Sequence, residues 1–123
     1  MSEKPRIFVI DDDVTMLSLI ERTLRMASYE VVVSSEVLGT TQKIKQFDPD
    51  IVIVDHQMPA LTGENFIRIV RRQPNSRPRI LMYSAMPRQE MEQRALDAGA
   101  DVYVCKTDGM SELLAAVSRL LRN

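Results

Sequence analysis

Four short apolar runs of this chain each lead into a side chain that can bind or transfer charge. Two runs end at carboxylates, one ends at a hydroxyl and one ends at an ammonium group. Carboxylate oxygens bind hard cations and can attack phosphorus, while a hydroxyl and an ammonium group can stabilise phosphoryl oxygens. In chain order these residues are Asp11, Asp12, Asp13, Asp55, Ser84 and Lys106.

The carboxylates among them would repel one another if the fold brought them together. Two unit charges about 4 Å apart interact by roughly 4 kcal/mol at an effective dielectric near 20. Asp11, Asp12 and Asp55 carry three negative charges and Lys106 returns one positive charge, so one divalent cation would balance the rest. Oxygen ligands favour Mg²⁺, which also accepts a phosphate oxygen. This chemistry predicts phosphoryl transfer to a carboxylate, and the spacing leaves open which aspartate attacks.

Three nearby residues are predicted to be structural instead. Asp13 stands before a helical pattern, where an aspartate commonly caps the first turn. His56 adjoins Asp55, but consecutive side chains on a strand point to opposite faces, which favours a packing or solvent role. Cys105 shares a strand face with Tyr103 and is predicted to belong to the core.

The elements that must hold these residues alternate between two patterns. Five short runs rich in branched apolar residues are typical of strands covered on both faces. Between and after them, apolar residues recur with a helical period, as Leu17, Ile20 and Leu24 do. The predicted strands are 7–10, 31–33, 51–54, 80–83 and 102–105, and the predicted helices surround 17–24, 66–70 and 113–120 and span 40–47 and 88–98.

This order predicts an α/β protein with one doubly wound (βα)5 domain of the flavodoxin-like class. Its five-stranded parallel sheet would carry helices on both faces, because parallel crossovers are long and right-handed. The length of 123 residues suits a single domain over 1–123. Ligands of such sheets bind beyond the carboxyl ends of the strands, where the residues described above stand.

Composition argues against several other classes of protein. The net charge of −1 indicates neither a nucleic-acid nor a membrane partner, and the arginines between 68 and 94 are read as a solvated helix face, with an acidic partner or nucleic acid as the alternative. The sequence contains no apolar stretch of the ~20 residues that a membrane span needs, and its start does not resemble a signal peptide, so a cytoplasmic location is expected. One cysteine and one histidine argue against disulfides and against Cys- or His-rich metal sites.

Four segments of the sequence resemble the CheY-like receiver domain of two-component response regulators. They are IFVIDDD at 7–13, IVDHQMP at 53–59 with Gly63 after it, ILMYSA at 80–85 and AGADVYVCK at 98–106. Together they span nearly the whole chain in the family's order and spacing. The resemblance implies a phosphorylation-activated signalling switch, which catalyses only its own phosphorylation and dephosphorylation.

The resemblance also implies a role for each site residue. Asp55 would accept a phosphoryl group from a phosphohistidine of a sensor histidine kinase or phosphotransfer protein. Ser84 and Lys106 would contact that group, and Gln57 and Met86 would tune its hydrolysis. The implied Mg²⁺ ligands are Asp12 directly, Asp11 through water, Asp55, and the backbone carbonyl of Gln57.

The implied switch consists of Ser84 and Tyr103. Phosphorylation of Asp55 would draw the Ser84 hydroxyl inward, and the Tyr103 ring would then rotate from an exposed to a buried position and repack against the helix 88–98. The implied partner is a downstream protein or an output domain, and a homodimer that forms on phosphorylation is a further candidate. Neither direct nucleic-acid binding nor membrane binding is expected.

The chain departs from the family at one position. The family lysine is commonly followed by proline through a cis peptide bond, whereas Thr107 follows Lys106 here. A cis bond before a residue other than proline costs about 2.5 to 4 kcal/mol, so we expect a trans bond and a reshaped loop through 108–109. The chain is either a free-standing receiver or a part of a longer regulator.

Two alternative functions remain. The segment 11–15 also fits D-x-D-x-[TV], the first motif of haloacid-dehalogenase-type phosphatases, in which Asp11 would attack and Asp13 would act as general acid and base. Against this class, the chain is short for a cap, no acidic pair follows a strand downstream of Lys106 to hold the metal, and Asp55 would have no role. The other alternative is a pseudo-receiver that works by partner contacts alone, although all of its site positions are filled.

Overall fold

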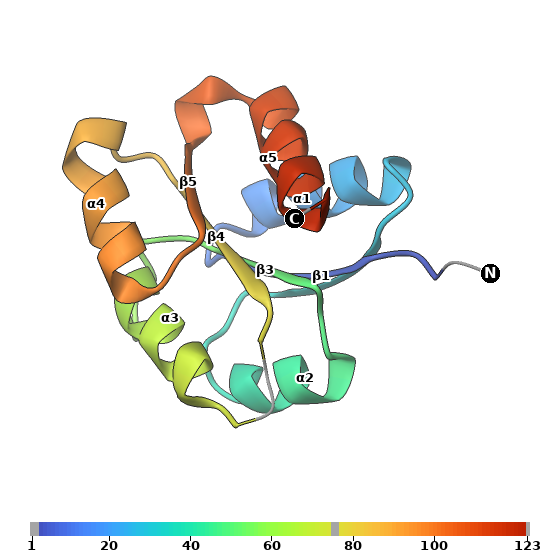
Figure 1. Ribbon diagram of the computed structural model, residues 1–123, viewed down its shortest axis with the longest axis horizontal. Coiled ribbons are helices and arrows are strands. Elements are labelled where there is room, and N and C mark those ends of the chain that lie inside the picture. The colour runs from blue at the N-terminus through green and yellow to red at the C-terminus, as the bar shows by residue number, and fades with distance from the viewer. Residues whose placement is uncertain (1–2, 75–76, 123) are drawn as a thin grey trace.

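The computed structural model describes residues 3–74 and 77–122 of the chain. Within these residues, strands and helices alternate along the whole sequence (Figure 1). The elements are β1 (Arg6–Ile10), α1 (Val14–Met26), β2 (Glu30–Ser34), α2 (Thr40–Phe47), β3 (Ile51–Val54), α3 (Gly63–Arg72), β4 (Arg79–Ser84), α4 (Arg88–Ala98), β5 (Val102–Cys105), the 3₁₀ helix η1 (Lys106–Asp108) and α5 (Met110–Arg122).

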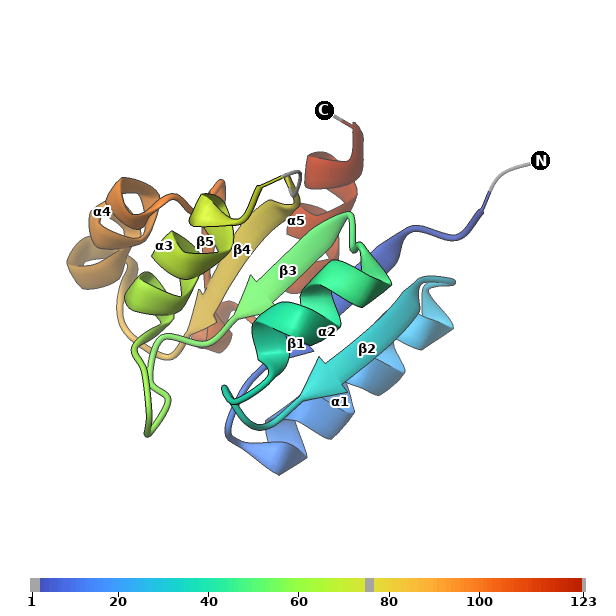
Figure 2. The same cartoon turned by 90° about the horizontal axis from the view of Figure 1, so that it is seen from below.

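The five strands form one parallel sheet in the order β2-β1-β3-β4-β5 (Figure 2). The chain moves from β1 outward to β2 and then returns to β3 on the other side, so the strand order reverses between β1 and β3. Ile10 pairs with Val54 in the register of these two strands, which places the residues that follow them side by side. A reversal of this kind is where open α/β sheets bind ligands.

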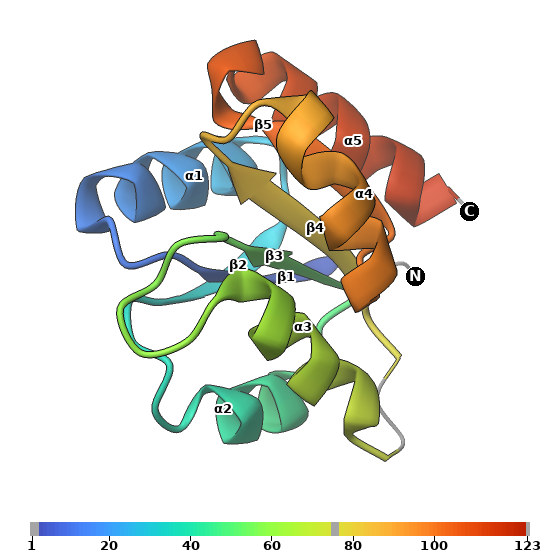
Figure 3. The ribbon, with the colours of Figure 1, turned by 90° about the vertical axis from the view of Figure 1, so that its left-hand side faces the viewer.

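Helices cover both faces of the sheet, as the sequence predicts. Helices α1 and α5 lie on one face, and α2, α3 and α4 lie on the other (Figures 1 and 3). The inward side chains alternate along the strands, so Phe8 joins the core beneath α2, α3 and α4, whereas Ile7 and Val9 join the core beneath α1 and α5. In the part of the chain that the structure describes, the helices are too short or too polar to cross a membrane.

The predicted strands and helices are confirmed, and the observed strands differ from the predicted ones only at their ends. The strands gain Arg6, Glu30, Ser34, Arg79 and Ser84, because the parallel hydrogen-bond ladders continue past the apolar runs. Ser84 is therefore the last residue of β4 rather than the first residue after it.

Two local predictions are also confirmed. The Asp13 carboxylate caps α1 by accepting hydrogen bonds from the backbone amides of Thr15 and Met16. The described residues contain no cis peptide bond, so the bond between Lys106 and Thr107 is trans, and the loop there is rebuilt as η1.

Candidate functional site

Three carboxylates meet at the carboxyl ends of β1 and β3. Asp11, Asp12 and Asp55 each place one oxygen so that all three oxygens lie within 4.8 Å of one another. Asp11 and Asp55 are buried, whereas Asp12 is exposed. The cluster is thus enclosed on its protein side and open toward solvent. A hard divalent cation such as Mg²⁺ suits this donor set, because it prefers oxygen ligands and keeps water in its remaining positions.

Lys106 is the cation that faces these carboxylates. Its Nζ lies 3.0 Å from Asp11 Oδ2 and 3.3 Å from Asp55 Oδ1. The ammonium group also lies 5.9 Å from the centre of the Tyr83 ring, within the range of a cation–π contact. Burial by itself would lower the pKa of Lys106, but the hydrogen bond to Asp11 and the charge of Asp55 outweigh it, so the pKa lies above its ordinary value.

Asp55 has an unusual protonation equilibrium for an aspartate. Burial and the negative charge of Asp11 raise its pKa, Lys106 partly opposes them, and the resulting pKa is about 6. A bound cation would favour the ionised form. Ionisation bears on the chemistry, because only the carboxylate form of Asp55 can act as a nucleophile.

The loop after Asp55 is held tightly against the start of α3. The Gly63 amide donates a 2.8 Å hydrogen bond to the carbonyl of His56. A Cβ atom at Gly63 would stand 2.3 Å from the Asp55 carbonyl oxygen, so a side chain at this position would push the helix away from the acceptor. The absence of a side chain at Gly63 therefore allows the start of α3 to pack directly against the backbone of Asp55 and His56.

An open depression of about 450 Å³ lies beside the carboxylates. Asp12 and the exposed residue Gln57 both contribute to its wall. Of the three clustered carboxylates, Asp12 is the one that borders this depression. The remaining lining residues are His56, Met58, Pro59 and Thr62.

Ser84 lies at the end of β4, next to β3 in the sheet, and is almost fully buried. Its Oγ accepts a 3.1 Å hydrogen bond from the Met86 amide, so the hydroxyl is held within the turn that follows the strand. The side chain therefore ties the end of β4 to the segment that leads into α4.

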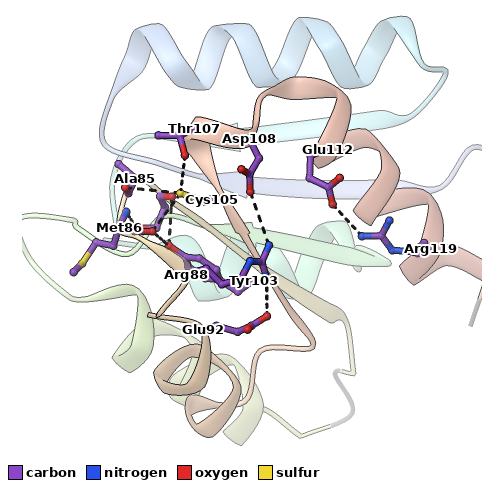
Figure 4. A network of polar contacts seen from close by, with 11 residues as sticks. Ala85, Met86, Arg88, Glu92, Tyr103, Cys105, Thr107, Asp108, Glu112 and Arg119 are labelled. Carbon is purple, nitrogen blue, oxygen red and sulfur yellow. Dashed lines mark hydrogen bonds and ion pairs between the residues drawn. The ribbon is translucent and has the colours of Figure 1, made fainter. Parts of the chain in front are cut away.

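The Tyr103 ring occupies the buried position in this structure, with 1% exposure. The sequence predicts that this ring rotates from exposed to buried on phosphorylation, and the structure shows the buried position. The reason lies in its partners: the hydroxyl donates to the backbone carbonyl of Met86 and, at 3.4 Å, to that of Ser84. The Arg88 guanidinium lies 5.9 Å from the ring centre and covers it from the α4 side (Figure 4).

Cys105 and Thr107 complete the polar contacts on this side (Figure 4). The Cys105 sulfur lies 3.3 Å from the Met86 carbonyl and 3.1 Å from Thr107 Oγ1. Cys105 is buried in the same core as Tyr103, which confirms its predicted place. The carbonyl of Met86 is thus shared by the tyrosine and the cysteine.

Sequence reasoning missed two residues, Glu64 and Arg94. His56 is buried, but its Nε2 lies 3.2 Å from Glu64 Oε1, so its role includes a specific polar contact as well as packing. Glu64 in turn binds the Arg94 guanidinium at 2.7 Å. These residues lie in separate segments of the chain, and no regular sequence spacing relates them. The sequence therefore carries no signal for the contact.

Comparison with known proteins shows which family of sequences this chain is similar to. A sequence model described as the response regulator receiver domain matches residues 7–118. The transcriptional regulatory protein PrrA of Mycobacterium tuberculosis is 33% identical over 118 residues, which are 96% of this chain and 50% of that protein. The chain spans about half the length of the curated relatives it matches.

Solved structures of response regulators are also similar to this chain. The signal receiver domain of a response regulator from Bermanella marisrubri is 31% identical with a TM-score of 0.86, and the match covers 97% of this chain and 99% of that one. The chemotaxis response regulator CheY4 of Vibrio cholerae is 26% identical with a TM-score of 0.87, over 96% and 99% of the two chains. The fold, the grouped strand-end residues and these likenesses lead to one conclusion: the chain belongs to the receiver domain family of two-component response regulators.

Proposed function

We propose that this receiver accepts a phosphoryl group on Asp55, with Mg²⁺ bound by its neighbours, and that the phosphorylated form presents a changed protein-binding surface. The observation that carries the proposal is the position of the Asp55 carboxylate, which has an oxygen within 4.8 Å of an oxygen of Asp11 and of Asp12 and lies 3.3 Å from the Lys106 ammonium. An acceptor needs these features together: a carboxylate nucleophile, a cation site and a fixed positive charge.

The metal ligands in this proposal are Asp11, Asp12, Asp55 and the backbone carbonyl of Gln57. Bound Mg²⁺ would neutralise charge on the carboxylates and on the incoming phosphoryl oxygens. Asp12 is the exposed member of the group, which suits a ligand that a cation reaches first from solvent. Asp11 already accepts hydrogen bonds from Lys106 and from the Asp13 amide, which suits a ligand that acts through water.

In the transfer step, an Asp55 carboxylate oxygen forms a bond to phosphorus while the bond from phosphorus to the donor's imidazole nitrogen breaks. The imidazole keeps the electron pair and takes up a proton. Lys106 neutralises charge on the phosphoryl oxygens, and the Ser84 hydroxyl donates to one of them. Hydrolysis later regenerates Asp55 when water attacks the phosphorus and inorganic phosphate leaves.

The partners in this proposal are a sensor histidine kinase or phosphotransfer protein as donor and an output protein or output domain as receiver of the signal. PrrA carries the name of a transcriptional regulator and is about twice as long as the part matched here, which supports an output domain of that kind. We further propose that 1–123 acts as one domain, that it works in the cytoplasm, and that phosphorylation can promote a homodimer.

The phosphatase alternative is not supported by the geometry around Asp13. Its carboxylate caps α1, so it is engaged by two backbone amides and is poorly placed to act as a general acid. A pseudo-receiver that works by partner contacts alone gives no reason for three carboxylates and an ammonium group to be brought together at the strand ends.

Intact mass measurement after incubation with a small acyl-phosphate donor tests the proposal. We expect the mass of the chain to increase by one phosphoryl group when Mg²⁺ is present. No increase should appear when the metal is chelated before the donor is added. Asp55→Asn should abolish the gain. Asp13→Asn is the matched control, because asparagine also caps helices, and it should label like the wild type. Labelling that persists in Asp55→Asn, or that is lost only in Asp13→Asn, would contradict the proposal.

A further inference from the structure

A chain of polar contacts leads from the residue after Asp55 to α4. His56 Nε2 lies 3.2 Å from Glu64 Oε1 at the start of α3. Arg94 on α4 donates to the same oxygen at 2.7 Å through Nη2 and to Glu64 Oε2 at 3.4 Å through Nε. Figure 3 shows α3 and α4 lying side by side, which brings these residues together across 30 positions of sequence.

Glu64 is well buried for a charged residue, since its side chain is only 14% exposed. Burial would raise the pKa of its carboxyl, but the hydrogen bonds from Arg94 and His56 outweigh burial, so the pKa lies below its ordinary value. A carboxylate in this setting depends on its donors, because a buried charge that loses them is costly. Glu64 therefore holds both donors in place.

His56 has little freedom to form other contacts. Its side chain is 10% exposed, and its Nδ1 is buried without a hydrogen-bond partner among the described residues. The contact with Glu64 is thus the polar interaction that orients the ring. The backbone of His56 is also tied, because its carbonyl accepts from the Gly63 amide at the first turn of the helix that carries Glu64.

We propose that Glu64 couples the position of α4 to the geometry of the acceptor segment 55–57, through Arg94 on one side and His56 on the other. This inference rests on the proposed function. His56 is covalently joined to both Asp55 and Gln57, so a shift of the His56 backbone changes the positions of the acceptor carboxylate and of the proposed metal-binding carbonyl. The connection runs along the α3 side of the site, apart from Ser84 and Tyr103.

The coupling has a definite direction. Arg94 is half exposed, so it can either bind Glu64 or turn into solvent when α4 shifts. While it binds Glu64, it helps to hold His56 and the acceptor segment in one arrangement, and loss of the contact should loosen that segment. By linkage, a ligand that needs the ordered segment must in turn favour the Arg94 contact.

The test uses the full chain with Mg²⁺ and beryllofluoride, a phosphoryl mimic. The variants are Arg94→Gln, which removes the charge, and Arg94→Lys, which keeps it. Arg68→Gln is the matched control, because Arg68 is an exposed arginine on α3 whose hydrogen bond goes to Asn65 instead. Two quantities are measured by NMR: the ring nitrogen shifts of His56 before any addition, and the affinity for the mimic from backbone amide shifts.

We expect Arg94→Gln to change the His56 ring shifts and to weaken mimic binding at least three-fold. Arg94→Lys should recover most of that affinity, and Arg68→Gln should match the wild type. In the wild type, the Arg94 Nε–H signal should shift when the mimic binds. Unchanged affinity in Arg94→Gln, or an equal loss in Arg68→Gln, would overturn the coupling. Failure of the wild type itself to bind the mimic would overturn the proposed function, and this outcome is seen without any variant.

Discussion

The ammonium group of Lys106 lies 3.0 Å from a carboxylate oxygen of Asp11, although 95 positions separate the two residues in the chain. The parallel sheet explains this proximity, because β1 and β5 both end at the same edge. Lys106 also reaches Asp55, so a single ammonium group balances two buried carboxylates. The stability of the protein and the chemistry of the site therefore depend on the same contacts.

Removal of the ammonium group should destabilise the fold. Lys106→Met leaves Asp11 and Asp55 without their cation, and we expect the free energy of unfolding at neutral pH to fall by about 1 to 3 kcal/mol. Urea unfolding measures the change, with Lys45→Met on the exposed face of α2 as the control. Added Mg²⁺ should restore part of the loss. Equal stabilities of the two variants would show that Lys106 does not balance the buried carboxylates.

The raised pKa of Asp55 predicts that the free energy of unfolding depends on pH. The folded protein holds the Asp55 proton up to about pH 6, whereas the unfolded chain releases it near the ordinary value of 3.8. Between these values the native state binds more protons, so this group makes the protein less stable as the pH rises.

Asp55→Asn removes that cost, and we expect it to raise the free energy of unfolding by about 1 to 2 kcal/mol at neutral pH. The gain should shrink as the pH falls through the window from 6 to 3.8. Thermal unfolding of both proteins over that window checks this. A gain that stays constant with pH would mean that the Asp55 carboxyl does not titrate there.

The fold and most of the site could be predicted because their signals are local. Apolar runs mark the strands, helical periods mark the covering helices, and parallel strands bring their carboxyl ends together whatever lies between them. Asp11 and Asp55 follow from this rule alone. The assignment of Asp55 as acceptor and of Tyr103 as switch needed the family resemblance as well.

Contacts between side chains of separate elements could not be predicted. The buried state of Tyr103 depends on where the turn after β4 places the Met86 carbonyl, and the sequence does not report that position. The contact of Arg94 with Glu64 depends on how α3 and α4 pack. From sequence, Arg94 was one of several arginines on a solvated face, and half of its side chain is indeed exposed.

Ser84 should connect phosphorylation to Tyr103. Its hydroxyl holds the Met86 amide, and the Met86 carbonyl accepts from the tyrosine, so movement of Ser84 toward a phosphoryl oxygen would disturb the tyrosine's partner. We expect Ser84→Ala to accept phosphate on Asp55 but to lose the change in Tyr103 ring signals that phosphorylation causes in the wild type. Ring NMR with and without beryllofluoride measures this, and Ser118→Ala on α5 is the control. A wild-type tyrosine that ignores the mimic would contradict this route.

Met86 should also influence how long the phosphoryl group persists. Its side chain offers no hydrogen bond to an attacking water and is half-buried against the core that contains Tyr103, two residues after Ser84. Met86→Glu supplies an acceptor that can orient water, so we expect dephosphorylation to become several-fold faster. Release of inorganic phosphate after removal of the donor gives the rate. An unchanged rate would exclude Met86 as a determinant of the lifetime.

The central claim is that Asp55, and neither of its acidic neighbours, forms the bond to phosphorus. Borohydride reduction tests it most directly, because it converts an aspartyl phosphate into homoserine, which tandem mass spectrometry then locates in the peptide sequence. After incubation with an acyl phosphate and Mg²⁺, we predict homoserine at position 55, with Asp11 and Asp12 unmodified. Homoserine at position 11, or at no position in a protein that binds Mg²⁺, would contradict the account.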